Sequence, residues 1–229
     1  MKSRRTIHIA TAFFLLSFLV VLLSWAGNIY AWEGVRSLMN VQGVRWFLRS
    51  VQINFVQCPV LPPAMILFFG LGLWLHSGMG NAVYRAFASN SHFSRKERYA
   101  LMQSSIAGVL YVLQFCILAF GPWDIVKSAL GSLYDSPLSL GVWFVISLGI
   151  GFMGFVYGFL SDNYHSDRDV VSGMMSYYMQ RADFFVSLFF ISQFFNILQF
   201  SGLHLFWGMS DNVLTYIYIA FCIYPLFRK

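Results

Sequence analysis

The chain has 229 residues, of which 58% are hydrophobic and only 10% are charged, and its formal net charge is +6. A soluble domain carries about 25% charged residues, so this composition excludes a soluble enzyme, a disordered tail and a secreted disulfide scaffold. The cysteines Cys58, Cys116 and Cys222 are odd in number and far apart along the sequence, which argues against a disulfide framework or a metal cluster. The sequence predicts an all-α polytopic membrane protein that lies in a lipid bilayer.

Six apolar stretches predict about six transmembrane helices, at about 10–31, 60–80, 100–121, 138–160, 184–206 and 212–227. Crossing the hydrocarbon takes about 20 helical residues, so the first five stretches are long enough and the sixth is marginal. None of the six contains Lys, Arg, Asp or Glu. The first stretch also has features of a signal peptide, but its apolar run continues through Ala31 and favours an uncleaved helix. No repeat or linker divides the chain, so 1–229 is expected to be a single membrane domain.

Two connections have the pattern of amphipathic helices at the membrane surface. Over 41–57, apolar residues recur at helical spacing while Arg45 and Arg49 fall on the other side. A second such helix is expected to begin at Ser166, which can cap it, with Asp169 complementing the positive end of the helix dipole. Burying the two arginines would be costly, so the 41–57 helix is expected to lie on the membrane rather than cross it.

Lys and Arg are unevenly distributed over the connections. One side, which includes both termini, holds eleven of them, and the other side holds Arg36, Arg45, Arg49 and Lys127. The positive-inside rule then predicts a multi-pass protein of the cell inner (cytoplasmic) membrane with both termini in the cytoplasm. The 81–99 connection would face the cytoplasm and the 32–58 connection would face away from it. The positive net charge fits membrane anchoring and not nucleic-acid binding.

The motifs of catalysis are missing from the sequence: it has no Gly-rich phosphate loop, no cysteine pair at metal spacing and no nucleophile elbow. We therefore predict no enzyme activity, no cofactor and no metal. His76 is an ionisable residue within the second stretch, which makes it a candidate for a substrate path. The alternative, which the absence of a carboxylate partner favours, is a neutral histidine near the cytoplasmic end of the span, bonded to a carbonyl group.

Amides and glycines supply the remaining candidates. Gln193, Asn196 and Gln199 lie three residues apart in the fifth stretch, and Gln114 lies in the third. They could line a polar path, although such amides more often bond packed helices to one another. A set of glycines in the fourth stretch favours close helix packing over a hinge: Gly149, Gly151, Gly154 and Gly158. The segment 199–202 could also interrupt the fifth span, and broken helices often mark substrate sites.

Two blocks of sequence resemble the p-aminobenzoyl-glutamate transporter (AbgT) family. The first includes residues 35–38 (Val-Arg-Ser-Leu), residues 43–46 (Gly-Val-Arg-Trp) and the glycine-rich stretch that ends His76-Ser77-Gly78. The second starts at Ser136-Pro137, passes through residues 166–171 (Ser-Asp-Arg-Asp-Val-Val) and reaches Gln193-Phe194. The second block matches the order and spacing of the later half of the family pattern. Together the blocks touch roughly 130 positions.

The resemblance also implies what this chain would lack. Family members are roughly twice as long. After Arg85 the family pattern has a re-entrant hairpin and further helices, whereas here the chain runs almost directly to Arg95. After Tyr224 the family pattern continues into a further conserved segment, which is not present here. These are the parts in which the family's substrate and ion contacts lie.

Two functions follow as hypotheses. The first is a transporter-derived membrane subunit or scaffold that binds other membrane proteins or forms a homo-oligomer, which explains the uncharged spans and the glycine-rich packing face. The alternative is a shortened secondary transporter of a small organic anion, working as an oligomer or with a partner chain. An anion needs cations or helix dipoles at depth, and the stretches supply only amides, hydroxyls and one histidine near the membrane edge. The chain alone is therefore expected not to take up p-aminobenzoyl-glutamate.

Overall fold

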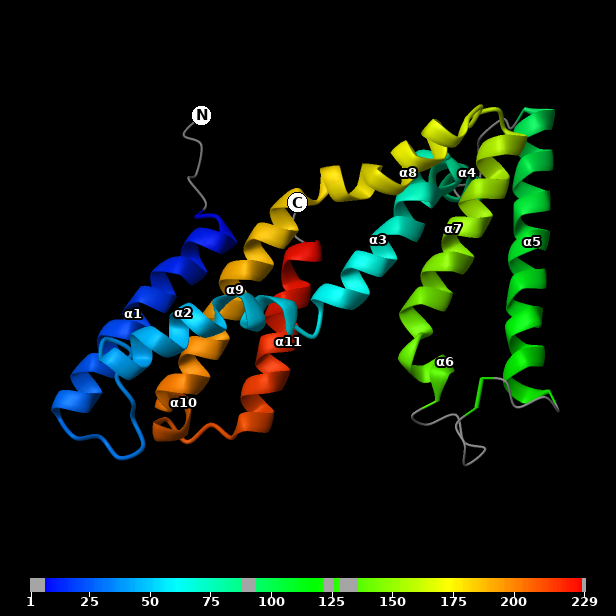
Figure 1. The fold of residues 1–229 in the computed structure, drawn as a ribbon. Helices are drawn as coiled ribbons and strands as arrows, with labels where there is room; N and C mark the ends of the chain where they lie inside the picture. The colour runs from blue at the N-terminus through cyan, green and yellow to red at the C-terminus, as the bar shows by residue number, and fades with distance from the viewer. Residues whose placement is uncertain (1–6, 88–93, 122–125, 128–135, 228–229) are drawn as a thin grey trace, which may run out of the picture. The chain divides into compact units, whose positions relative to one another are not determined.

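The computed structural model describes residues 7–87, 94–121, 126–127 and 136–227, and every regular element among them is a helix. The chain forms two compact units (Figure 1). The first comprises Met1–Pro62 and Arg181–Lys229, and the second comprises Pro63–Gln180. Five helices are long and apolar enough to cross a membrane when α2 and α3 are counted together, and α11 is a shorter apolar helix. The prediction of an all-α polytopic membrane protein is confirmed.

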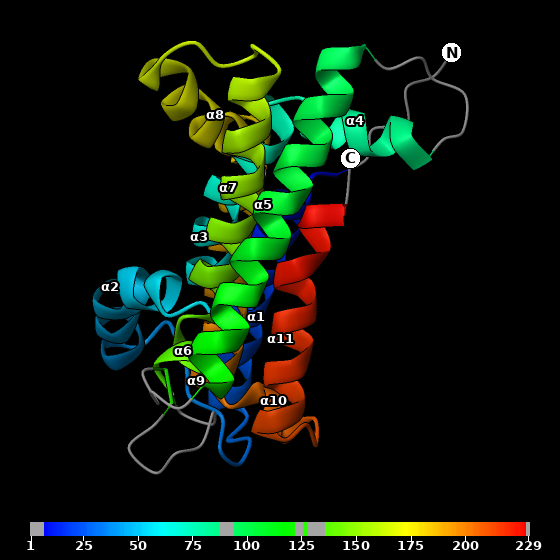
Figure 2. The same cartoon turned by 90° about the vertical axis from the view of Figure 1, so that its right-hand side faces the viewer.

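The first unit is a bundle of three long helices with a fourth lying across them. Its elements are α1 (Ile9–Ile29), α2 (Val41–Val56), α9 (Ala182–Ser201), α10 (Leu203–Phe206) and α11 (Asp211–Phe227). Helix α9 packs against α1 on one side and α11 on the other. Figures 1 and 2 show α1, α9 and α11 side by side, with α2 crossing α9 at a steep angle. The packing of this unit is largely aromatic: Phe13, for example, makes edge-to-face contacts with Phe194 and Phe221.

The second unit is built on an antiparallel pair of helices. It contains most of α3 (Leu61–His76), with α4 (Met79–Phe87), α5 (Arg95–Phe120), α6 (Pro137–Leu140), α7 (Val142–Leu160) and α8 (Asp167–Gln180). Helices α5 and α7 pack along their length in opposite directions (Figure 1). The start of α5 is fixed by a capping box, in which Ser94 and Glu97 satisfy one another's backbone N–H groups. Arg85 of α4 donates to the same Glu97 at 2.8 Å.

The predicted spans and the observed helices agree closely, with two refinements. The fourth span opens with the short helix α6, which ends at Gly141, before α7 begins. The fifth span is broken: α9 ends at Gly202, whose φ of 73° is the left-handed conformation that glycine adopts without strain. An added Cβ on Gly202 would collide with the carbonyl oxygen of Gly34, so the break depends on packing against the α1–α2 connection.

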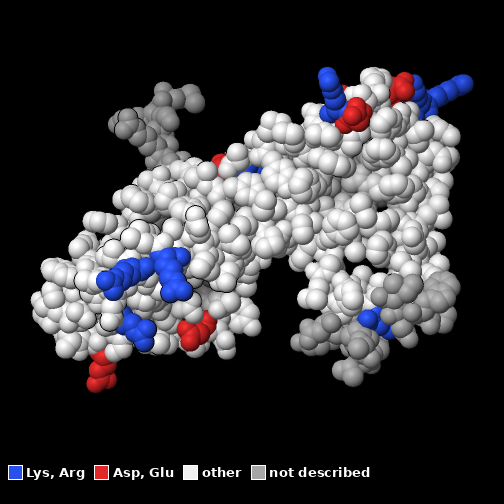
Figure 3. Space-filling model, in the orientation of Figure 1, with Lys and Arg blue, Asp and Glu red and all other residues white. Residues whose placement is uncertain are grey.

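Both amphipathic segments are helical. Helix α2 begins after Asn40, whose side chain accepts a hydrogen bond from the Gly43 N–H at 2.6 Å. The predicted cap of α8 is present, since Ser166 Oγ accepts from the Asp169 N–H and the Asp169 carboxylate accepts from the Ser166 N–H. Figure 3 shows charged side chains over α2 and near helix ends, while the middles of the spanning helices are uncharged.

The position of α2 in a membrane stays a prediction, as does the orientation of the chain. Several residues that carry the orientation argument lie outside the described residues: Lys2, Arg4, Arg5, Arg228 and Lys229, together with 88–93 of the 81–99 connection.

Candidate functional site

A buried amide pair joins α9 to α2 in the first unit. Gln193 is 4% exposed and Asn54 is 7% exposed. Asn54 Nδ2 donates to Gln193 Oε1 at 3.3 Å, and Gln193 Nε2 donates to the carbonyl oxygen of Val51 at 2.9 Å. An amide in apolar surroundings is costly unless it is hydrogen-bonded, so this pair fixes the crossing of α2 over α9.

Gln193 also lies at the wall of an apolar pocket in the same unit. This pocket, which we call the Gln193 pocket, has a volume of about 440 Å³ and is lined by residues of α1, α2 and α9 together with Leu38 of the α1–α2 connection. Its aromatic lining consists of Phe14, Phe18, Phe47, Phe189 and Phe190. Ser17 is a second polar group at the wall, and its hydroxyl donates to the Phe13 carbonyl. The pocket therefore offers aromatic surface with very little polar surface.

The other two candidate amides of α9 point elsewhere. Asn196 Nδ2 donates to the Ser192 carbonyl at 2.8 Å, and Gln199 is exposed. Both line a small cavity of about 30 Å³ beside α11, together with Tyr218. The three-residue spacing therefore does not produce one polar face, since Gln193 bonds to α2 while the other two lie toward α11.

His76 and Gln114 belong to the second unit, and both are exposed. The His76 ring stacks on the ring of Tyr164 with a centroid separation of 5.7 Å. Gln114 lies on the outward side of α5. Within their unit the structure does not bring these two residues together into one site.

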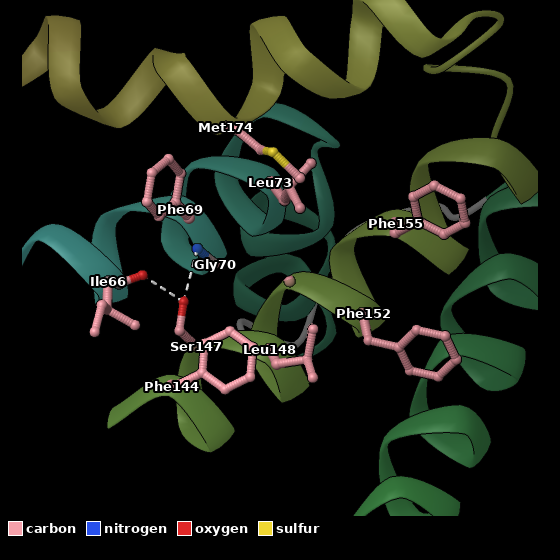
Figure 4. Close-up of a pocket in the computed structure, with 11 residues that line it drawn as sticks. Ile66, Phe69, Gly70, Leu73, Phe144, Ser147, Leu148, Phe152, Phe155 and Met174 are labelled. Atoms are coloured by element: carbon pink, nitrogen blue, oxygen red, sulfur yellow. Dashed lines mark hydrogen bonds between the residues drawn. The ribbon is translucent and has the colours of Figure 1, made fainter. Parts of the chain in front are cut away.

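The second unit has its own apolar pocket between α3 and α7, with a volume of about 520 Å³ (Figure 4). Its main polar group is Ser147, so we call it the Ser147 pocket. Ser147 Oγ accepts a hydrogen bond from the Gly70 N–H at 3.1 Å and donates to the Ile66 carbonyl at 2.5 Å (Figure 4). Gly70 and Ile66 are four residues apart, so the hydroxyl bridges a donor and an acceptor that an α-helix normally pairs with one another.

Ser147 is one of several side chains that bond to the backbone of α3. Donors from α7, from α8 and from the turn between them reach five carbonyl oxygens along the helix and just beyond its end: Ser147 to Ile66, Asn163 to Ser77, Tyr164 to Leu73, Ser176 to Gly72 and Tyr178 to Met65. Burial raises the pKa of Tyr164 to about 12, so this phenol stays protonated and keeps its donor. Together these bonds anchor α3 to its neighbours through the main chain.

The glycines of α7 lie where neighbouring elements approach closely. A Cβ added at Gly154 would lie 2.7 Å from the Trp74 Cα, and one added at Gly149 would lie 2.7 Å from the Tyr111 ring. Gly151 faces Gly70, and Gly158 faces the Tyr164 ring. The donors to α3 were not among our candidates. A serine or a tyrosine within an apolar stretch was the available signal, but the acceptor was a distant backbone.

Comparisons with known proteins agree with this architecture. Residues 84–215 match the model of the AbgT putative transporter family. No curated protein matches the chain. The solved structure of the Alcanivorax borkumensis YdaH transporter is similar with a TM-score of 0.74 at 13% identity, covering 87% of this chain and 72% of that chain. The structure of Neisseria gonorrhoeae MtrF, described with a class of antimetabolite efflux pumps, is similar with a TM-score of 0.75 at 14% identity, covering 96% and 77%. At these identities the two structures establish a shared fold.

Proposed function

The chain belongs to the AbgT putative transporter family, and from this we propose that it is a membrane subunit of a transport system for a small organic molecule with an aromatic or apolar body. It would work as an oligomer or with a partner chain. The Gln193 pocket is the observation that carries this proposal, because aromatic walls with one or two polar groups are typical of sites for such molecules.

A dicarboxylate such as p-aminobenzoyl-glutamate fits this pocket poorly. Its carboxylates would lose hydration and gain neither a cation nor a free helix N-terminus, since the described spanning helices carry charged residues only in their first turns. We therefore expect the chain alone not to accumulate this anion.

The test compares two probes on the purified protein in lipid nanodiscs: a neutral p-aminobenzoate ester and p-aminobenzoyl-glutamate. We expect saturable binding of the ester, measured by quenching of tryptophan fluorescence, and no binding of the dicarboxylate. Val21→Trp fills the Gln193 pocket and should abolish binding, whereas Gln114→Ala, on the outward side of α5, should leave it unchanged. Binding that survives Val21→Trp would refute the site.

Transport is tested in liposomes with labelled p-aminobenzoyl-glutamate and an imposed ion gradient. Accumulation above that of the Gln193→Ala, Asn196→Ala double variant would contradict our expectation and would identify the α9 amides as an anion path.

A second function, a scaffold that binds other membrane proteins, is supported by the bonding of the amides. Gln193, Asn54 and Asn196 all spend donors on protein groups within the first unit. If the chain is a scaffold, native mass spectrometry of the complex from mild detergent should find a fixed set of other membrane proteins at a constant ratio. A homo-oligomer that binds the ester would favour the transport subunit.

We further propose that the protein lies in the inner membrane with both termini in the cytoplasm. The excess of Lys and Arg on one side supports this orientation. In a cysteine-free background, an impermeant thiol reagent outside spheroplasts should label Gln42→Cys in α2 and should not label Ser172→Cys in α8. The reverse pattern would overturn the orientation.

A further inference from the structure

The corner at which α9 breaks contains a buried histidine. After Gly202 the chain makes the single turn of α10 and then reaches Asp211, where α11 begins. His204 lies in α10 and is 1% exposed, whereas the side chain of Asp211 is 64% exposed. The corner is also held by the Arg36 N–H, which donates to the Ser201 carbonyl at 2.9 Å.

Both ring nitrogens of His204 face acceptors. Nδ1 lies 3.2 Å from the carbonyl oxygen of Leu198, and Nε2 lies 2.9 Å from Oδ1 of Asp211. A carbonyl oxygen can only accept, and an ionised carboxylate can only accept. A neutral imidazole has one N–H and would satisfy one of these contacts while turning a lone pair toward the other acceptor. Two N–H groups satisfy both.

We propose that His204 and Asp211 form a proton-binding site, in which the imidazole carries a proton on both ring nitrogens and the carboxylate balances its charge. The exposed Asp211 keeps its ionised form hydrated, so the proton belongs on the ring. The buried ring is oriented by the carbonyl of α9 on one side and by the start of α11 on the other. The proton therefore ties the end of α9 to the beginning of α11. This inference does not depend on the proposed transport function.

The site makes the corner sensitive to pH. Loss of the proton leaves one ring nitrogen without an N–H against an acceptor, which removes a charge-assisted hydrogen bond and replaces it with lone-pair repulsion. The other charged groups around the corner are Glu33 and Arg36 of the α1–α2 connection, and among the described contacts neither bonds to the His204 ring. The folded corner holds a proton that the unfolded chain releases, so raising the pH destabilises it.

The test is the protonation state of the ring itself. In protein labelled with ¹⁵N-histidine and reconstituted in lipid at about pH 7.5, His204→Gln identifies the signal of this residue. We expect the pattern of an imidazolium, with both nitrogens bearing protons, and a neutral tautomer in Asp211→Asn. A neutral imidazole in the unsubstituted protein at this pH overturns the proposal, and so does an imidazolium that persists in Asp211→Asn.

A stability measurement separates the proton from general damage to the fold. The melting temperature of the unsubstituted protein should fall by several degrees between about pH 6 and pH 9 relative to His204→Gln, which lacks the site. His165→Gln removes an exposed histidine in the second unit and should keep the pH dependence. Asp167→Asn removes an acid from the first turn of α8, as Asp211→Asn does from α11, and serves as its control. Equal pH dependence with and without His204 would contradict the proposal.

Discussion

Ser147 Oγ accepts a hydrogen bond from the backbone N–H of Gly70 at 3.1 Å, so a side chain of α7 reaches the main chain of α3. This approach requires a residue without Cβ, because a methyl group at Gly70 would collide with the backbone carbonyl of Ser147. The contact decides how closely α3 and α7 pack at the Ser147 pocket.

Gly70→Ala should therefore be strongly destabilising, by roughly 3 kcal/mol, since backbone has to move away from backbone. Ser147→Ala should cost only about 1 kcal/mol, because Gly70 N–H and Ile66 C=O can pair with one another within the helix. Thermal unfolding in detergent measures both. Gly80→Ala is the control, because its added methyl meets only the ends of the Leu75 and Trp74 side chains. Equal effects at Gly70 and Gly80 would contradict the packing described.

The buried amides of α2 and α9 should show energetic coupling. Asn54→Ala and Gln193→Ala each leave a partner amide unsatisfied, so the double variant should be more stable than the sum of the single losses predicts, by about 0.6 kcal/mol. A double-mutant cycle on unfolding free energies measures this difference. Gln199→Ala, at an exposed position on the same helix, should be additive with Asn54→Ala. Coupling to Gln199 in place of Gln193 would be inconsistent with the hydrogen bonds found here.

Cys58 and Cys222 should be open to cross-linking within one chain. Both are wholly buried, and their sulfur atoms are 3.8 Å apart although 164 residues separate them. A small membrane-permeant disulfide reagent would accept the two electrons, and the thiols would release two protons to solvent as the Cys58–Cys222 disulfide forms. In a Cys116→Ser background, mass spectrometry should find the Cys58–Cys222 peptide under non-reducing conditions. Absence of this peptide after full unfolding protects both thiols, and its presence only between two chains, would each speak against the fold of the first unit.

The start of α8 should loosen in acid. Hydrogen bonds from the backbone N–H groups of His165 and Ser166 lower the pKa of the Asp169 carboxyl. A lowered folded-state pKa means that the stabilisation is present above the unfolded value of about 3.9 and is lost as the pH falls through the folded value. Hydrogen exchange at the His165 and Ser166 amides should accelerate below about pH 4. Asp169→Asn should show faster exchange already at neutral pH, and Asp167→Asn should not.

Much of the fold follows from local sequence. Hydrophobic length placed the spanning helices within a few residues, and the Ser166 cap was predicted from its spacing to Asp169. Local pattern could not decide whether the fifth span is continuous, because a glycine in a helix is tolerated until tertiary contacts select its left-handed conformation. At Gly202 that selection comes from Gly34, which is far away in the sequence.

The candidate site was less predictable for the same reason. Gln193 was chosen for its polarity, but its partner Asn54 lies on a helix 139 residues away. The cysteines appeared too far apart to matter, yet Cys58 and Cys222 are neighbours in the first unit. Sequence separation carries no information about such meetings.

The attachment of α3 has a consequence for how this fold can drift during evolution. The five side chains that hold it bond to main-chain oxygens, which every amino acid supplies. Residues such as Met65, Ile66 and Leu73 can be exchanged for other apolar residues without removing a single acceptor. Only the donors and the glycines beneath them are held to one identity. A helix anchored in this way can lose most of its recognisable sequence while its position persists, which is how a common architecture outlasts an identity as low as 13%.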